Sequence, residues 1–263
     1  MRTLAVDGAV LGYDVDGAGS PVVFVHGTGT HRLTFGPVIE SLPDGQAFVT
    51  YDRRGFGASR GALARHLAQH ADDLAALVRV LASGPATVVA QSGGAVVALQ
   101  LAATRPELVR QLVLAEPVLH MARVPSASAL RALAAMQARR FLQRKSAAAV
   151  VGFYRWSSWR RDGTNAYDLC PEEWQRVAEE HADAVFRELR QMLVPFPSAR
   201  TIGRIACPVT LVIGDIGQPV FHRTTRLTAR LLPHANTVSV ADSGHLIAMD
   251  QPAAFAAVVA DLL

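Results

Sequence analysis

Residues 87–99, TVVAQSGGAVVAL, have the pattern of a strand, a sharp turn and a helix. The β-branched run TVVA suits a buried parallel strand, and the residues from Ala95 onward favour a helix. Between them, Gln91, Ser92, Gly93 and Gly94 form a tight small-residue turn with the serine at its apex. A serine on such a turn projects its hydroxyl above the sheet edge, where the helix aims its N-terminal amides. Ser92 is therefore a candidate nucleophile.

The composition is that of a globular protein with a large core. The chain has 263 residues, 50% of them hydrophobic and 18% charged, which suggests one domain with an insertion. Residues 1–13 contain no continuous apolar run, so we expect a cytoplasmic protein without a membrane partner. The formal charge is +4, but the arginines are scattered, and this argues against a nucleic-acid partner.

The sequence contains no motif for a metal, a nucleotide or a flavin, and we expect no cofactor. Its two cysteines, Cys170 and Cys207, lie far apart without metal-ligand spacing, and we expect two buried free thiols. No feature indicates an oligomeric state.

A glycine-rich loop follows an early buried strand. Strands are expected at 4–13 and 21–26, and the second runs directly into the HGTGT segment at 26–30. Such a loop at the carboxyl end of a parallel strand presents unpaired backbone amides to the crevice where these sheets bind ligands. The N–H of Thr28 is a candidate oxyanion donor, and the alternative is a glycine loop without a chemical role.

Two other strand ends carry chemically useful side chains. Glu116 follows the expected strand at 109–115, which places it on the same rim as Ser92. It is a candidate either for a catalytic carboxylate or for the partner of a nearby arginine. His245 follows the expected strand at 236–240, and from this rim it can reach the serine.

Other charged positions are interpreted as structural. Asp52 is expected to bind the amides of its own loop. Arg53 and Arg54 are expected to be solvated on that exposed loop, the alternative being contact with a substrate carboxylate. His66 and His70 have the i, i+4 spacing of metal ligands but lack a third ligand, so a solvated helix face is preferred. The expected helices include 66–81, 95–104, 224–232 and one from 252, and further strands are expected at 47–51 and 208–214.

The alternation of strand and helix stops at residues 118–205. This segment has the pattern of helices at 127–143, 147–159 and 171–193. It contains nine of the seventeen aromatic residues, and most of these are expected to pack its core. Phe153, Trp156 and Trp159 are candidates for lining a substrate pocket.

Together, the motifs resemble the α/β-hydrolase superfamily. HGTG, YDRRGFGAS, AQSGG, a strand ending in IG and a final SGH occur in the family's order, with Ala90 replacing the first glycine of GxSxG. The resemblance implies an α/β fold with a mostly parallel sheet flanked by helices, formed by residues 1–117 and 206–263, and a helical cap at 118–205. It also implies Ser92 as nucleophile, His245 as general base and the amides of Thr28 and Gly93 as oxyanion hole.

The acid departs from the usual pattern of the superfamily. An aspartate is usual three residues after the glycine that closes the strand at 214, and this chain has Gly217 there. A minority of the superfamily, including hydrolases similar to zearalenone lactonase, carries its acid after the preceding strand. Glu116 matches that site, Asp215 is the competitor, and a site without a working acid is the third alternative. Asp242 is too close to His245 in sequence to bend back onto its ring.

The resemblance implies a serine hydrolase that cleaves a carboxylic ester or lactone through an acyl-enzyme on Ser92. The aromatic-rich insertion favours a mostly apolar or aromatic small molecule as its substrate and partner. A serine at position 92 argues against epoxide hydrolases and dehalogenases, which use an aspartate there. The alternatives are acyl transfer or cyclisation, and a non-hydrolytic protein on the same scaffold.

Overall fold

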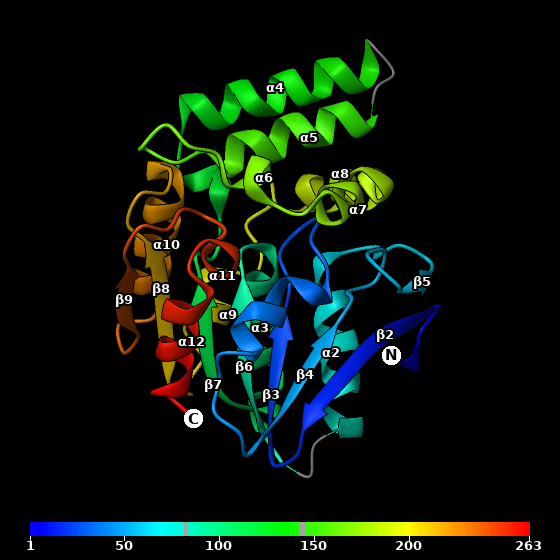
Figure 1. Ribbon diagram of the computed structural model, residues 1–263, viewed down its shortest axis with the longest axis vertical. Helices are drawn as coiled ribbons and strands as arrows, with labels where there is room; N and C mark the ends of the chain where they lie inside the picture. Colours follow the sequence, from blue (N-terminus) through cyan, green and yellow to red (C-terminus); the bar gives the residue numbers. More distant parts are fainter. Residues whose placement is uncertain (82–83, 143–145) are drawn as a thin grey trace.

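The buried strand that precedes Ser92 lies inside a mixed β-sheet in the computed structural model, which describes residues 1–81, 84–142 and 146–263 (Figure 1). The strands are β1 (Arg2–Val6), β2 (Ala9–Gly17), β3 (Ser20–Val25), β4 (Gln46–Tyr51), β5 (Arg60–Gly61), β6 (Ala86–Gln91), β7 (Val109–Ala115), β8 (Val209–Gly214) and β9 (Asn236–Val240). Their order across the sheet is β1-β2-β4-β3-β6-β7-β8-β9, and β5 pairs with β2. The strands from β4 to β9 in this order run parallel, whereas β2 is antiparallel to β1, β4 and β5.

Helices connect the parallel strands and cover both faces of the sheet. The α-helices are α1 (Gly36–Ile39), α2 (Leu67–Leu81), α3 (Gly93–Thr104), α4 (Ala127–Phe141), α5 (Ser146–Ser157), α6 (Ala166–Leu169), α7 (Glu172–Glu180), α8 (Ala182–Gln191), α9 (Ala199–Ile202), α10 (Pro219–Leu231), α11 (Ile247–Asp250) and α12 (Pro252–Ala260). Short 3₁₀ helices occupy Arg32–Phe35, Pro106–Leu108 and Met121–Arg123. Within the described ranges, no helix is both long and apolar enough to cross a lipid bilayer.

The core is divided by the sheet into two layers. Successive residues of β6 alternate between them, because side chains of a strand point to opposite faces. Val88 packs with α2 and α3, whereas Val89 packs with α1, α11 and α12. Both faces of the central strands are thus apolar, which explains the continuous β-branched run in the sequence.

Helices α4 to α8 lie above the carboxyl ends of the parallel strands (Figure 1). They share a hydrophobic cluster of their own that includes Met136, Val150, Tyr154 and Phe186, with Phe56 reaching into it from the loop after β4. Because Ser92, Glu116 and His245 follow β6, β7 and β9, they all lie on the edge that these helices cover. The helical segment therefore forms the roof of any site at this edge.

Several predicted element boundaries are wrong. The strand expected at 4–13 is a hairpin of β1 and β2, because Gly8 turns the chain with a φ of 70°. The helix expected at 171–193 is two helices, because the chain leaves helical geometry at His181. This break lets α7 and α8 both contribute to the hydrophobic cluster shared by helices α4 to α8. The helix expected at 224–232 begins at Pro219, where proline suits the first turn. The helix expected at 127–143 is observed to Phe141, and residue 143 lies outside the described residues.

Candidate active site

Ser92 lies at the apex of the turn between β6 and α3 in a backbone conformation that is rare for serine. Its φ and ψ are 54° and −119°, and its N–H donates to the carbonyl of Ala115 at 2.9 Å. The turn can be this tight because Gly94 has no Cβ: a Cβ there would lie 2.4 Å from the carbonyl oxygen of Val25. A strained serine held rigidly at a strand end is typical of a nucleophile elbow.

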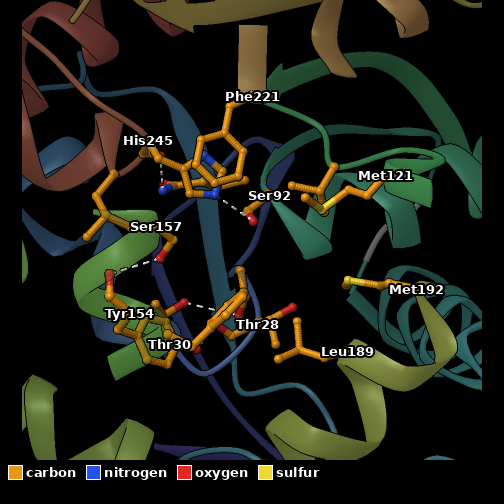
Figure 2. Close-up of a pocket in the computed structure, with 15 residues that line it drawn as sticks. Thr28, Thr30, Ser92, Met121, Tyr154, Ser157, Leu189, Met192, Phe221 and His245 are labelled. Carbon is orange, nitrogen blue, oxygen red and sulfur yellow. Dashed lines mark hydrogen bonds between the residues drawn. The ribbon is translucent and has the colours of Figure 1, made fainter. Parts of the chain in front are cut away.

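The imidazole of His245 lies between Glu116 and Ser92 (Figure 2). Its Nδ1–H donates to Glu116 Oε2 at 2.7 Å, and its Nε2 accepts the Ser92 hydroxyl at 3.0 Å. Glu116 is fully buried and His245 is 4% exposed. With the proton on Nδ1, the free lone pair of Nε2 faces the serine, which is the arrangement required of a general base.

Glu116 has two further contacts that fix its carboxylate. Its Oε1 accepts the N–H of Gly214 at 3.2 Å and lies 3.8 Å from Nε2 of His222, which donates to the Gly214 carbonyl. Asp215, the competing acid, makes no hydrogen bond to His245 in the described part of the chain, and its buried Oδ1 has no partner there. Of the two carboxylates, Glu116 is thus the one that contacts the imidazole.

Two neighbours hold the histidine in place. The ring of Phe221 stacks on the imidazole with centroids 3.6 Å apart and planes 9° apart. The Gln91 side-chain amide donates to the carbonyl of His245 at 3.0 Å. Since Gln91 precedes Ser92, the nucleophile turn itself anchors the histidine loop.

Thr28 lies beside Gly93, where an added Cβ would come 2.3 Å from the Thr28 hydroxyl oxygen. That hydroxyl donates to Glu188 Oε1 at 2.8 Å, and the Thr28 carbonyl accepts the hydroxyl of Tyr154. Glu188 and Tyr154 belong to α8 and α5, so helices of the roof hold the glycine-rich loop. The structure thus places Thr28 beside the first residue of α3, and an oxyanion hole formed by the Thr28 and Gly93 amides stays a prediction.

The prediction that Arg53 and Arg54 are solvated is wrong. Both side chains are buried, Arg53 completely, because each meets a buried carboxylate. Arg53 Nη1 donates to Glu188 Oε1 at 3.0 Å, and its Nε donates to the His26 carbonyl at 2.9 Å. Arg54 forms a bidentate pair with Asp73 at 2.7 and 2.9 Å. Neither guanidinium is available to a substrate carboxylate.

Asp52 accepts from the N–H groups of Arg32 and Ala58, which fits its expected structural role.

The expectation of a solvated helix face is also wrong for His70, which is 3% exposed because α2 packs it beneath the arginine loop. Burial and the nearby Arg53 and Arg54 lower the pKa of His70 well below its usual value.

Among the described residues, no group of three or more histidine, cysteine or carboxylate side chains could hold a metal. Cys170 and Cys207 are free thiols but only partly buried, and burial raises the pKa of the Cys170 thiol to about 12.

A cavity of about 40 Å³ opens at Ser92 and His245 (Figure 2). Phe153 lines it, whereas Trp156 lines an adjoining apolar chamber instead. Trp159 lines neither of the two and is 42% exposed, because it lies two residues beyond the end of α5 at Ser157. Two of the three aromatic candidates therefore border the site region.

Sequence reasoning missed Glu188, Tyr154, Phe221 and Gln91 as neighbours of the site. Gln91 could have been found from its position next to the candidate nucleophile. Glu188 and Tyr154 lie 160 and 126 residues from Thr28 in sequence, and no local pattern links them to it.

The chain is similar to several known proteins. Residues 22–258 match the family described as the alpha/beta hydrolase family. The chain is 38% identical over 122 residues to the uncharacterized hydrolase YraK of Bacillus subtilis, a match that covers 44% of each chain. It is 28% identical over 274 residues to the esterase Rv0045c of Mycobacterium tuberculosis, covering 97% of this chain and 87% of the relative.

Among curated relatives, the putative non-heme bromoperoxidase BpoC of M. tuberculosis is 41% identical, but the match covers only 40% of each chain. The chain thus spans less than half the length of YraK and BpoC. A solved structure described as Est816, an N-acyl homoserine lactone degrading enzyme, superposes with a TM-score of 0.81 at 20% identity and covers all of both chains. The family match and the shared fold show that this chain belongs to the alpha/beta hydrolase family.

Proposed function

We propose that this chain is a serine hydrolase that cleaves a carboxylic ester or lactone through an acyl-enzyme on Ser92. One observation carries the proposal: His245 lies within hydrogen-bond distance of both Ser92 Oγ and Glu116 Oε2, at 3.0 and 2.7 Å. A nucleophile, a base and an orienting acid in that order form the arrangement that activates a serine. The esterase and the lactone degrading enzyme named among the similar proteins support the reaction class.

Ser92 Oγ attacks the carbonyl carbon while His245 Nε2 takes the hydroxyl proton. Negative charge develops on the carbonyl oxygen, and the amides of Thr28 and Gly93 are the proposed donors that stabilise it. The bond to the leaving oxygen then breaks as Nε2 returns the proton to it. Water, activated in turn by His245, releases the acid from Ser92.

Glu116 has a supporting role in this scheme. Its carboxylate holds the imidazole with the proton on Nδ1 and stabilises the imidazolium that forms when Nε2 takes the serine proton. The Phe221 ring, stacked on the imidazole, limits its rotation and offers an aromatic face to the transient cation.

An apolar substrate fits the cavity, because Val118, Met121, Phe153, Leu189 and Met192 are among the residues that line it. The helical segment 118–205 serves as the cap in this proposal, since all five of these wall residues belong to it. A small-molecule partner and a cytoplasmic location are parts of the same proposal.

The test is covalent labelling by a fluorophosphonate probe, followed by hydrolysis of short p-nitrophenyl esters. The wild type is expected to be labelled once per chain, and Ser92→Ala is expected to be neither labelled nor active. Ser158→Ala is the matched control, because Ser158 is buried in the segment after α5 and lines neither cavity. Labelling of Ser92→Ala at the wild-type rate would refute the proposal.

A further inference from the structure

The small cavity at Ser92 adjoins a much larger apolar chamber. The chamber has a volume of about 290 Å³, against about 40 Å³ for the cavity. Met121, Phe153, Leu189 and Met192 line both, so these four side chains form the partition between them. A water-sized group needs roughly 30 Å³, so the cavity alone holds little more than the reacting carbonyl group. Any longer part of a substrate must lie elsewhere.

The chamber offers hydrocarbon surface on its described sides. It lies between α4, α5 and α8, and the residues that line it apart from the partition are Ala122, Val124, Pro125, Ser126, Ala129, Leu130, Leu133, Trp156 and Leu193. None of these described residues is charged. The hydroxyl of Ser126 accepts the N–H of Ala129 as the N-cap of α4, so it is already used by the helix. A ligand here is recognised by burial of apolar area.

Two of the four partition residues have flexible side chains. These two, Met121 and Met192, are methionines, whose unbranched side chains change rotamer easily and adapt to different shapes. Figure 2 shows both side chains near the space beside Ser92: Met121 belongs to the 3₁₀ helix before α4, and Met192 directly follows α8. Because both thioethers line the cavity and the chamber, a change of their rotamers alters the partition while the helices stay in place.

The position of the chamber relative to His245 decides which end of an ester it receives. His245 Nε2 must return its proton to the leaving oxygen, so the leaving group lies on the histidine side of Ser92. Met121, Leu189 and Met192 lie on the other side of Ser92 in Figure 2. Met192 also borders Gly93, where an added Cβ would come 2.7 Å from its Cε. The chamber is thus on the acyl side.

We propose that this chamber is the acyl-chain pocket of the enzyme, and that its preferred substrates are esters or lactones of straight-chain acids. With a methylene taken as about the size of a water molecule, roughly 30 Å³, the chamber of about 290 Å³ fits acids of about eight to ten carbons. The inference rests on the proposed function and deepens it. Each methylene moved from water into the chamber contributes about 0.8 kcal/mol, which corresponds to about a fourfold gain in kcat/KM per carbon.

The test compares two ester series. In p-nitrophenyl esters from acetate to laurate, kcat/KM is expected to rise to the octanoate or decanoate and then fall. In acetate esters of alcohols of increasing length, kcat/KM is expected to change by less than about threefold overall. An acyl series without a rise, or a rise in the alcohol series instead, would overturn the assignment.

A chamber-filling variant locates the effect. Ala129 is 8% exposed on the chamber face of α4, and Ala129→Phe is expected to lower the ratio of decanoate to acetate kcat/KM at least 30-fold. Ala134→Phe, on the exposed face of the same helix, is the matched control and is expected to keep the wild-type ratio. Ala129→Leu serves if the larger substitution prevents folding, with a smaller fall in the ratio. An unchanged ratio in folded Ala129 variants would contradict the proposal.

Binding separates this inference from the hydrolase proposal. Calorimetry with decanoate on Ser92→Ala, which performs no hydrolysis, is expected to show binding that Ala129→Phe in the same background weakens at least tenfold. If the wild type hydrolyses no ester but this binding pattern holds, the chamber still binds acyl chains and the hydrolase proposal fails. If esters are hydrolysed but decanoate does not bind, the chamber assignment fails alone.

Discussion

Gly217 lies against the carboxylate of Glu116: a Cβ added at position 217 would be 3.3 Å from Glu116 Oε1. Position 217 is where the sequence pattern of this superfamily usually has its acid, three residues after the glycine that ends β8. The two backbone positions therefore direct side chains to the same point beside His245. The carboxylate that orients the imidazole can come from either strand end, and in this chain it comes from the end of β7.

This convergence predicts a rescue. Glu116→Ala is expected to lower kcat/KM by about 10³- to 10⁴-fold, because the imidazole loses its orienting acid. Adding Gly217→Asp to that variant is expected to recover at least tenfold, since the new carboxylate reaches the vacated space. The control is Glu116→Ala with Gly217→Asn, because asparagine has the shape of aspartate without its negative charge. Ester kinetics check both, and equal activity of the aspartate and asparagine variants would contradict the relationship.

The buried pair of Arg53 and Glu188 predicts a stability cycle. Their side chains are 0% and 2% exposed, so removing one partner leaves the other as an unpaired charge buried away from water. Arg53→Met or Glu188→Leu alone is expected to lower the free energy of unfolding by about 3–5 kcal/mol. The loss in free energy of unfolding in the double variant is expected to be smaller than the sum of the losses in the two single variants. Urea denaturation measures the cycle, and additive losses would show that the pair is uncoupled.

The same pair predicts a catalytic effect that differs between the two single variants. Glu188 Oε1 lies 2.9 Å from the point where a Cβ on Gly93 would be, so an unneutralised carboxylate there opposes the oxyanion. Arg53→Met is therefore expected to lower kcat more than Glu188→Leu does. Steady-state kinetics on folded protein below the unfolding temperature check the order, and the reverse order would refute the electrostatic argument.

Buried histidines predict a loss of stability in mild acid. Burial, together with nearby Arg53, lowers the pKa of His26 and His70 well below 6.5 in the folded state. Below about pH 6.5 the unfolded chain therefore binds protons at these positions that the folded chain does not, and the free energy of unfolding falls as pH falls. The slope is about 1.4 kcal/mol per pH unit for each such histidine.

His70→Gln removes one of these titrating groups. Its free energy of unfolding is expected to fall less between pH 7.5 and 5.5 than that of the wild type, as measured by urea denaturation at each pH. His66→Gln, at an exposed position directly before the same helix, is the control and is expected to retain the wild-type slope. A wild-type slope in His70→Gln would mean that the buried ring is not the source.

The stack of Phe221 on His245 predicts a positioning effect on turnover. With the ring centroids 3.6 Å apart, Phe221 restrains the imidazole and faces the cation that forms during attack. Phe221→Leu is expected to lower kcat by about 2- to 30-fold, which is the kinetic equivalent of about 0.5–2 kcal/mol of cation–π stabilisation. Phe221→Trp retains an aromatic face and is expected to lose less. Equal losses in both variants would assign the effect to packing.

The parts of the site that the sequence predicted are those fixed by local chain geometry. A β-branched run, a small-residue turn and a helix place Ser92 at a strand end, and the same reasoning places Glu116 and His245 on that edge. Parallel strands bring their carboxyl ends together, so chain order alone predicts the meeting of these three residues.

The parts that the sequence did not predict depend on distant contacts. Arg53 and Glu188 are 135 residues apart, and only the folded roof brings the carboxylate to the arginine loop. The exposure of His70 depends on which face of α2 meets that loop, and the helical period alone does not specify this at a polar position. The position of Trp159 outside the two cavities depends on where α5 ends, which the sequence pattern does not fix to the residue.

The most direct test of the account is ester hydrolysis by the wild type, Glu116→Gln and Asp215→Asn, with folding checked by circular dichroism. The account predicts that Glu116→Gln loses at least 10³-fold in kcat/KM while Asp215→Asn stays within about threefold of the wild type, because only Glu116 contacts His245. Loss of activity in Asp215→Asn with near wild-type activity in Glu116→Gln would contradict it.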